Sequence, residues 1–179
     1  MSVFHIREAK QEDMLAMATV RVQTWRATYK EILPDAFLAK LSYRNVAEHW
    51  KKIFWQERQP GVGLFVAENE QDEIIGIAIC GPEQNDDLEY RGEIYVLYVL
   101  PAYQRQGMGK ALVAACVQYL IGELAARTML IWVIAENPYR KFYESLGGKR
   151  VREKKQEIGG KMILEAGYGW DEIDQLLSS

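Results

Sequence analysis

The stretch Leu97–Leu112, LYVLPAYQRQGMGKAL, joins a strand-like apolar run to a helical pattern through a proline and two closely spaced glycines. The first turn of a helix exposes unpaired backbone N–H groups and carries about half a positive charge, so an anion can bind there. Gly107 and Gly109 allow close approach to the backbone, and Arg105 and Lys110 add charge. An ordinary strand-to-helix connection, with glycines for tight packing, is the alternative interpretation.

Two familiar nucleotide-binding loops can be tested against this stretch position by position. A dinucleotide fingerprint, GxGxxG, requires a third glycine where Leu112 stands. A Walker loop requires glycine at Gln104 and Ser or Thr at Ala111. Neither motif is present, so the glycines do not indicate a nucleotide loop of either kind.

The remaining patterns predict one domain over residues 1–179 with a mixed α/β, α+β-like fold rather than a doubly wound one. In chain order the predicted elements are the strand FHIREAK, helices at about 12–30 and 34–56, the hairpin PGVGLFVAENEQDEIIGIAIC, the strand EIYVLYV, a helix at about 107–126, the strand TMLIWVIA, the helix NPYRKFYESLGG, two short strands ending at KMILEAGYGW, and the brief helix WDEIDQLL.

The first helix has apolar residues at spacings of three and four, which predicts one buried face. Those residues are Leu15, Ala18, Val22, Trp25 and Tyr29.

Composition excludes several classes of function. The 179 residues are 49% hydrophobic with a net charge of −3, and no basic stretch interleaved with aromatics indicates nucleic-acid binding. Cys80 and Cys116 show no metal-ligand spacing, so we expect no metal site. The N-terminus lacks an apolar signal core, and no apolar run reaches the roughly 20 residues of a membrane span. We therefore expect a cytoplasmic protein without a membrane partner.

Two segments carry a resemblance to a known family. VLPAYQRQGMGKAL resembles V-x-P-x-Y-Q-R-x-G-x-G-x-x-L of the GNAT superfamily of N-acyltransferases, which contains its acyl-CoA signature Q/R-x-x-G-x-G/A. NPYRKFYESLGG resembles the family's N-x-x-A-x-x-F-Y-E-x-x-G-F, with Arg140 in place of the alanine and Gly148 in place of the aromatic. The order of elements from about Phe4 to Glu165 also agrees with the family.

The resemblance implies a central, mostly antiparallel sheet with helices on both faces, in which the fourth and fifth strands splay apart. It also implies acetyl-CoA as cosubstrate, bound by the backbone of the fourth strand and by the turn that opens the following helix. The cosubstrate-binding residues implied in this way are Leu97, Val99, Gln104, Arg105, Gln106, Gly107, Met108, Gly109, Lys110 and Asn137. Helix capping before Pro138 also explains Asn137 without a ligand.

Acetyl transfer to an alkylamine needs a base, because an amine of pKa about 10.4 must lose a proton at a cost of about 4.6 kcal/mol at pH 7. The resemblance makes Glu93 the preferred base, acting through water. A solvated or paired glutamate at a strand end is the alternative. His49 is the rival base, although a surface or packing histidine also explains its place in an amphipathic helix.

The resemblance assigns Tyr143 as the acid that protonates the leaving thiolate, with Phe142 filling the core. A buried tyrosine with a structural hydrogen bond is the alternative. A backbone N–H of the splayed strand, at Leu97 or Val99, would stabilise charge on the thioester oxygen.

The acceptor is the part that the sequence specifies least. The resemblance places Trp25, Arg26 and Tyr29 at the acceptor pocket, although core packing also explains the two aromatic residues. The acidic loop with Asp86, Asp87 and Glu89 is either solvated or attracts a cationic amine.

Acidic composition favours a small cationic primary amine, with a polyamine as the first specific candidate. Protein N-termini are an alternative acceptor, and a catalytically silent acyl-CoA-binding sensor is the alternative to an enzyme. GNAT domains often pair, so a homodimer is a further expectation that no residue decides.

Overall fold

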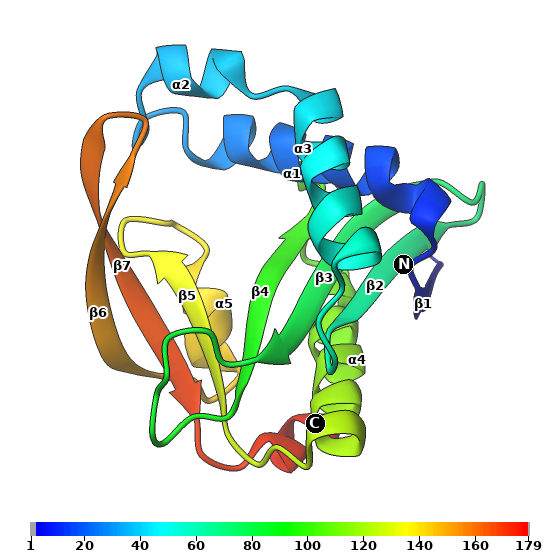
Figure 1. Cartoon of the computed structure of the whole chain (residues 1–179), viewed down its shortest axis with the longest axis vertical. Coiled ribbons are helices and arrows are strands. Elements are labelled where there is room, and N and C mark those ends of the chain that lie inside the picture. The colour runs from blue at the N-terminus through cyan, green and yellow to red at the C-terminus, as the bar shows by residue number, and fades with distance from the viewer. Residues whose placement is uncertain (1–2, 179) are drawn as a thin grey trace.

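The computed structural model describes residues 3–178 and contains one seven-stranded sheet in the order β1-β2-β3-β4-β5-β7-β6 (Figure 1). The parallel pair is β4 with β5, and the other neighbouring strands are antiparallel. The strands are β1 (Phe4–Glu8), β2 (Gly63–Asn69), β3 (Ile74–Pro82), β4 (Gly92–Val99), β5 (Met129–Ile134), β6 (Lys149–Ile158) and β7 (Lys161–Trp170). The predicted mixed, mostly antiparallel sheet is confirmed.

Helices cover both faces of the sheet, as predicted (Figure 1). They are α1 (Met14–Thr28), α2 (Asp35–Lys40), α3 (Tyr43–Lys51), α4 (Met108–Leu124) and α5 (Arg140–Ser145), with short helical turns at η1 (Gln11–Asp13), η2 (Lys52–Gln56), η3 (Pro101–Tyr103) and η4 (Ile173–Leu177). One core lies beneath α4 and contains Leu112 and Cys116. The core on the opposite face contains Met17 of α1 and Trp50 of α3.

Three details differ from the predicted elements. The helical region at 34–56 is broken, because Leu41 is extended and the Ser42 side chain accepts a hydrogen bond from Asn45 N at 3.2 Å, which caps α3. Leu15 is 54% exposed, so the buried face of α1 begins with Met14 and not with Leu15. The last two strands, predicted to be short, are ten residues each and form a long hairpin.

A bulge in β4 positions the functional region. Cys80 pairs with Ile94 and Ile79 pairs with Val96, which leaves Tyr95 as an extra residue in β4. Such a bulge bends its strand and increases its twist. The parallel ladder with β5 ends at Ile94, and the rest of β4 diverges from β5 (Figure 1). The predicted splayed strand pair is therefore present.

Candidate active site

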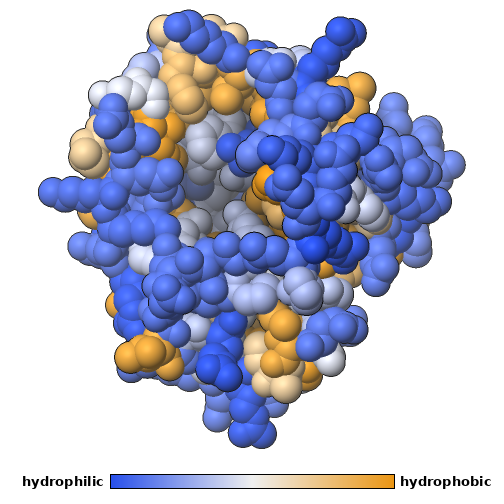
Figure 2. All heavy atoms as spheres, in the orientation of Figure 1, coloured by the Kyte–Doolittle hydropathy of each residue, from blue (hydrophilic) through white to orange (hydrophobic). Residues whose placement is uncertain are grey.

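A cavity of about 710 Å³ occupies the space between the diverging strands. Its walls come from α1, β4, the turn before α4, β5, α5 and the β6–β7 hairpin. Figure 2 shows the molecule hollowed near its centre, with a pale floor, hydrophobic residues above it and hydrophilic residues below it. The cavity has the size and the mixture of apolar walls and a few polar groups that are typical of small-molecule sites.

The free edge of β4 faces this cavity. Leu100 N donates to Ile75 O at 2.9 Å, so the alternation of an antiparallel ladder turns the backbone groups of Leu97 and Val99 away from β3. The Val99 carbonyl accepts a hydrogen bond from Gln104 Nε2 at 2.9 Å, which ties the end of β4 to the following turn. The amides of Leu97 and Val99 thus face the cavity.

The turn before α4 presents a second set of amides. Arg105 and Gly107 have positive φ angles of 60° and 85°, and the Ala111 amide donates to Gly107 O at 3.0 Å. Since that bond begins the helical ladder, the preceding amides in the first turn have no intrahelical acceptor. An ideal Cβ at Gly109 would lie 3.2 Å from Phe142 Cζ, so the helix packs closely on α5 there.

Not every residue predicted for the cosubstrate offers a side chain to it. Met108 is buried in the α4 core, and Gln106 Nε2 donates to Ala102 O at 3.4 Å. Neither lines the cavity, so both can contribute only backbone groups. Arg105 and Lys110 are exposed and line the cavity beside the free amides, where they add positive charge.

Alanine at Gly107 should weaken coenzyme A binding about tenfold, because a left-handed conformation costs a residue with Cβ about 1–2 kcal/mol. The matched control is Gly122→Ala in the same helix, where the added Cβ also meets nothing within 4 Å and φ is not positive. Isothermal titration with coenzyme A measures both variants. Equal affinities for the two would show that the conformation of Gly107 is not needed for binding.

Glu93 is buried at the start of β4, with 6% of its surface exposed, and it lines the cavity. Its Oε2 accepts a hydrogen bond from Gln84 N at 3.0 Å. Burial raises its pKa from the ordinary value of 4.5 to about 7, against the smaller lowering effect of that hydrogen bond. Burial excludes the solvated form of the alternative interpretation, whereas the Gln84 amide does give the carboxyl group a partner. A carboxyl group with this pKa can exchange a proton near neutral pH.

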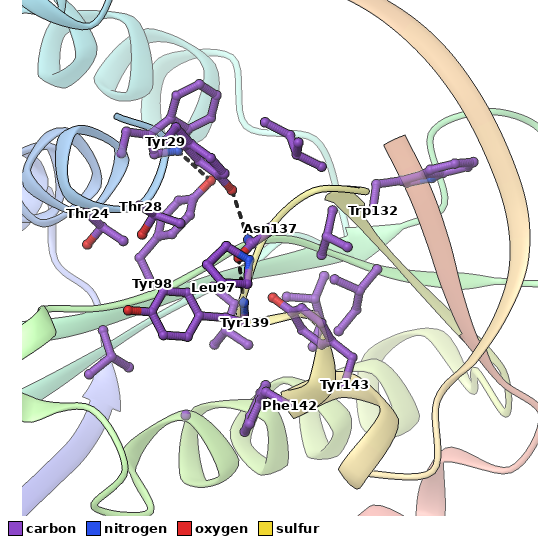
Figure 3. Close-up of a pocket in the computed structure, with 18 of the residues that line it drawn as sticks. Thr24, Thr28, Tyr29, Leu97, Tyr98, Trp132, Asn137, Tyr139, Phe142 and Tyr143 are labelled. Carbon is purple, nitrogen blue, oxygen red and sulfur yellow. Dashed lines mark hydrogen bonds between the residues drawn. The ribbon is translucent and has the colours of Figure 1, made fainter. Parts of the chain in front are cut away.

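Tyr143 points into the cavity from α5 (Figure 3). Its ring stacks on Tyr168 with centroids 5.9 Å apart, and Phe142 packs against its edge. Within residues 3–178 its hydroxyl makes no hydrogen bond, which disfavours a purely structural role. Burial raises the pKa of Tyr143 well above its usual range, so the hydroxyl keeps its proton and can donate it.

Asn137 links the turn before α5 to the C-terminal end of α1. Its Oδ1 accepts a hydrogen bond from Tyr139 N at 2.8 Å, and its Nδ2 donates to the Tyr29 hydroxyl at 3.1 Å (Figure 3). The first contact is the predicted capping of the turn before α5, although the regular helix begins three residues later, at Arg140. The second contact positions an α1 residue.

Two of the three residues predicted for the acceptor pocket line the cavity. Trp25 donates through Nε1 to the Tyr98 hydroxyl at 2.8 Å, and Tyr29 is held by Asn137. Arg26 does not line the cavity. It donates to Leu38 O at 3.1 Å and to the carbonyl of Leu41 at 2.7 Å, in the break between α2 and α3. Its assignment to the pocket is corrected, because those carbonyls occupy its guanidinium.

Replacement of Arg26 by methionine should therefore destabilise the fold by about 2 kcal/mol, since two partly buried carbonyls lose their donors. The KM for an acceptor should not change. Arg44→Met, at an exposed position of α3, is the matched control. Chemical denaturation measures stability; an increase in KM with unchanged stability would return Arg26 to the pocket.

The other sequence candidates lie outside the cavity. His49 is exposed on α3. Asp87 accepts from Arg152 Nε of β6 at 2.8 Å, and Glu89 pairs with the same guanidinium. The Arg152 contact is the main reason that the pKa of Asp87 lies below its usual range. The acidic loop is thus fastened to β6 by Arg152, and the charges of Asp87 and Glu89 are paired and not free to attract an amine.

Several lining residues escape the motif-based interpretation. Arg21, Thr24 and Thr28 follow the helical spacing of Trp25 on α1, so the stripe itself is a signal for them. Tyr98 lies between the two predicted backbone positions of β4. The wall opposite α1 is formed by Trp132 of β5, Lys154 and Gln156 of β6, and Glu165 of β7, whereas Ile158 of β6 packs in the same apolar cluster as Trp25 and Tyr29. The β6 residues of the lining are two positions apart, as expected for one face of a strand, but no local motif marks that face as functional.

Among the described residues, no helix has both the length and the apolar character needed to cross a membrane.

Comparison with known proteins agrees with this geometry. Residues 22–147 match the Acetyltransferase (GNAT) family. An uncharacterised N-acetyltransferase of Bacillus subtilis, YuaI, is 37% identical over 96% of this chain and 95% of its own length.

Solved structures show the same fold at low identity. A PaiA N-acetyltransferase from Thermoplasma acidophilum, in complex with coenzyme A, superposes with a TM-score of 0.65 at 20% identity over 91% of this chain and 98% of its own. A mutant form of the spermidine N-acetyltransferase SpeG from Vibrio cholerae superposes with a TM-score of 0.68 at 17% identity over 97% of this chain and 96% of its own. The family match and the bacterial relative together show that this chain belongs to the GNAT family of acetyltransferases.

Proposed function

We propose that this acetyl-CoA-dependent N-acetyltransferase acetylates the primary amine of a small cationic molecule, with a polyamine as the first candidate. The observation that carries the proposal is one cavity that joins the free backbone edge of β4, the amides before α4, buried Glu93 and the hydroxyl of Tyr143. Spermidine is named as the substrate of SpeG, which shares the fold.

The residues present fit the cosubstrate. The free amides at the start of α4, with Arg105 and Lys110 beside them, suit a pyrophosphate. The amides of Leu97 and Val99 and the free Leu97 carbonyl suit the amide groups of the pantetheine arm, which bind a strand edge as another strand does. Asn137 lines the same cavity, and its side chain is fixed by hydrogen bonds with Tyr29 and Tyr139.

Bound acetyl-CoA supplies an activated thioester. Glu93, ionised above pH 7, accepts a proton from the acceptor ammonium through water. An amide of the β4 edge donates to the thioester oxygen as negative charge develops there, and such preorganised donors contribute about 3–4 kcal/mol each. The neutral amine forms a C–N bond to the thioester carbonyl carbon, and the C–S bond breaks. Tyr143 donates its proton to the departing thiolate, and the excess proton on the new amide nitrogen returns to Tyr143 through water. The chain's own groups therefore cover proton removal, charge stabilisation and leaving-group protonation.

The acceptor class rests on charge within the cavity. Glu93 and Glu165 both line it, together with the aromatic residues Trp25, Tyr98 and Trp132. Cations of the lining are placed elsewhere or already on these rings: Arg105 and Lys110 lie beside the turn before α4, Arg21 lies 4.6 Å from the Trp25 ring centroid, and Lys154 lies 4.2 Å from that of Trp132. Carboxylates and aromatic faces attract ammonium groups when water is largely excluded. Protein N-termini as acceptors and a silent acyl-CoA sensor remain the alternatives to test.

Acetyl-CoA-dependent release of thiol, measured across polyamines, aminoglycosides, amino acids and short peptides, tests the proposal. Release that depends on a polyamine and saturates supports it. Release with peptides alone would assign protein N-termini as acceptors. Coenzyme A binding without release from any acceptor would favour the sensor.

Cytoplasmic location and a homodimer are further parts of the proposal. Light scattering of the purified chain would measure its mass against the 20.6 kDa of one copy. Fractionation of cells expressing the chain would test its location.

A further inference from the structure

Three side chains from neighbouring strands meet on the wall opposite α1. Glu165 lies opposite Ile134 of β5 in one register and opposite Lys154 of β6 in the other. Trp132 is two residues before Ile134, so its side chain lies on the same sheet face as that of Glu165. Figure 3 shows Trp132 at the end of the cavity opposite Thr24. All three side chains line the cavity.

The contacts within this trio are incomplete. Lys154 Nζ lies 3.8 Å from Glu165 Oε2, beyond hydrogen-bond distance, and 4.2 Å from the centroid of the Trp132 ring. Glu165 Oε2 and Trp132 Nε1 are both buried, and neither has a hydrogen bond within residues 3–178. Buried polar atoms normally have partners, so two without them on one cavity wall indicate a place for a ligand.

We propose that Glu165 and Trp132 form a seat for a second ammonium group of the acceptor, and that Lys154 occupies this seat until the acceptor displaces it. This inference rests on the proposed function. An alkylammonium over a tryptophan ring and beside a carboxylate is the arrangement that the Lys154 side chain already makes. The seat can therefore bind the alkylammonium group of a ligand.

Lys154 can leave the seat because it is on an edge strand. β6 is the last strand of the sheet, and the Lys154 side chain is 35% exposed against 15% for that of Glu165. A lysine stem is long and flexible, so its ammonium can turn to solvent while the carboxylate stays fixed. The departing lysine would leave its place on the Trp132 ring to the ligand.

The seat and the proposed base lie far enough apart to bind different ammonium groups. Glu93 is opposite Leu130 on β5, whereas Glu165 is opposite Ile134. Four residues along the strand and two strand spacings across the sheet separate their Cα atoms by about 16 Å. Side chains stand roughly perpendicular to a sheet and do not point along it toward each other, so the two carboxylates stay apart and each can pair with its own ammonium group. The arrangement selects an elongated diamine, with one amine near Glu93 and the other at the seat.

The test compares diaminooctane with octylamine, a diamine and a monoamine of equal chain length. We expect Lys154→Met, which keeps an apolar stem over Trp132, to raise the ratio of kcat/KM for diamine over monoamine about tenfold. Glu165→Gln should lower the same ratio about tenfold, mainly through KM. The exposed positions Lys155→Met and Glu157→Gln serve as matched controls, for which the ratio should not change.

Calorimetric titration measures the affinity for diaminooctane without turnover. The proposed ammonium seat can therefore be tested separately from the proposed reaction. Tighter binding by Lys154→Met supports the seat even if no acceptor is acetylated. An unchanged ratio and an unchanged affinity in that variant would overturn it. So would a loss of activity in Lys154→Met confined to acceptors that carry a carboxylate, since Lys154 would then bind an anion.

Discussion

Glu93→Gln lowers kcat by about 100-fold to 10,000-fold, the range expected when a general base is removed. Glutamine keeps the size of the side chain and can still accept the hydrogen bond from Gln84, so the change isolates the proton transfer. In the wild type, activity should rise with pH through about 7, where Glu93 ionises, and then level off. The variant should lose this rise. Steady-state rates with saturating acetyl-CoA between pH 5.5 and 9 measure both effects.

Coenzyme A affinity, measured by titration, should not change in this variant and serves as the control for folding of the cosubstrate site. A wild-type rate that is already flat across pH 7, together with a normal rate in Glu93→Gln, would remove Glu93 from the reaction.

The same carboxyl links activity to stability. Its pKa is raised from 4.5 to about 7, so between these values the unfolded chain loses a proton that the folded chain keeps. The free energy of unfolding therefore falls as pH rises through this window, by up to about 3 kcal/mol, and stays lowered above it. Glu93→Gln should be more stable than the wild type at pH 8 and nearly equal at pH 4.5. Thermal melting at the two pH values measures the difference.

The fold was predictable because each element carries a local signal. Turn residues separate the two apolar runs of the hairpin at residues 60–80, and glycines mark the turn before α4. The helix from about Gly107 follows as an uninterrupted helical pattern. The break at Leu41 was missed because a single Ser42 cap interrupts an otherwise helical composition. The exposure of Leu15 was missed since spacing fixes a helical face only to within about one residue.

The candidate site also has a part that the sequence predicts and a part that it does not. The CoA-facing backbone follows from one contiguous motif, whereas the acceptor wall is assembled from three strands distant in sequence. Trp132, Lys154 and Glu165 come together only through the register of β5, β7 and β6, which pairing over long distances decides. Arg26 shows the opposite failure: it stands beside Trp25 in the sequence, but helical geometry turns it toward the α2–α3 break. Proximity in the chain was a poor guide to the cavity.

Tyr143→Phe should lower kcat by about 100-fold while leaving the KM for acetyl-CoA nearly unchanged. Phenylalanine retains the stacking on Tyr168 and the edge contact with Phe142, so packing is preserved and only the hydroxyl is lost. The hydroxyl makes no hydrogen bond within residues 3–178, so its removal leaves no buried partner unsatisfied. The variant should melt within about 1 °C of the wild type, because packing and partners are both kept.

A matched control is Tyr168→Phe, which removes the other hydroxyl of the stacked pair. That hydroxyl donates to Glu144 Oε1 at 3.1 Å and does not line the cavity, so we expect its loss to change stability and not kcat. A second readout varies the thioester and not the acceptor. A thioester analogue whose leaving thiol is more acidic departs more readily as a thiolate, so it depends less on protonation by Tyr143. The defect of Tyr143→Phe should therefore shrink with such an analogue, whereas a residue that only shapes the cavity would show the same defect with both.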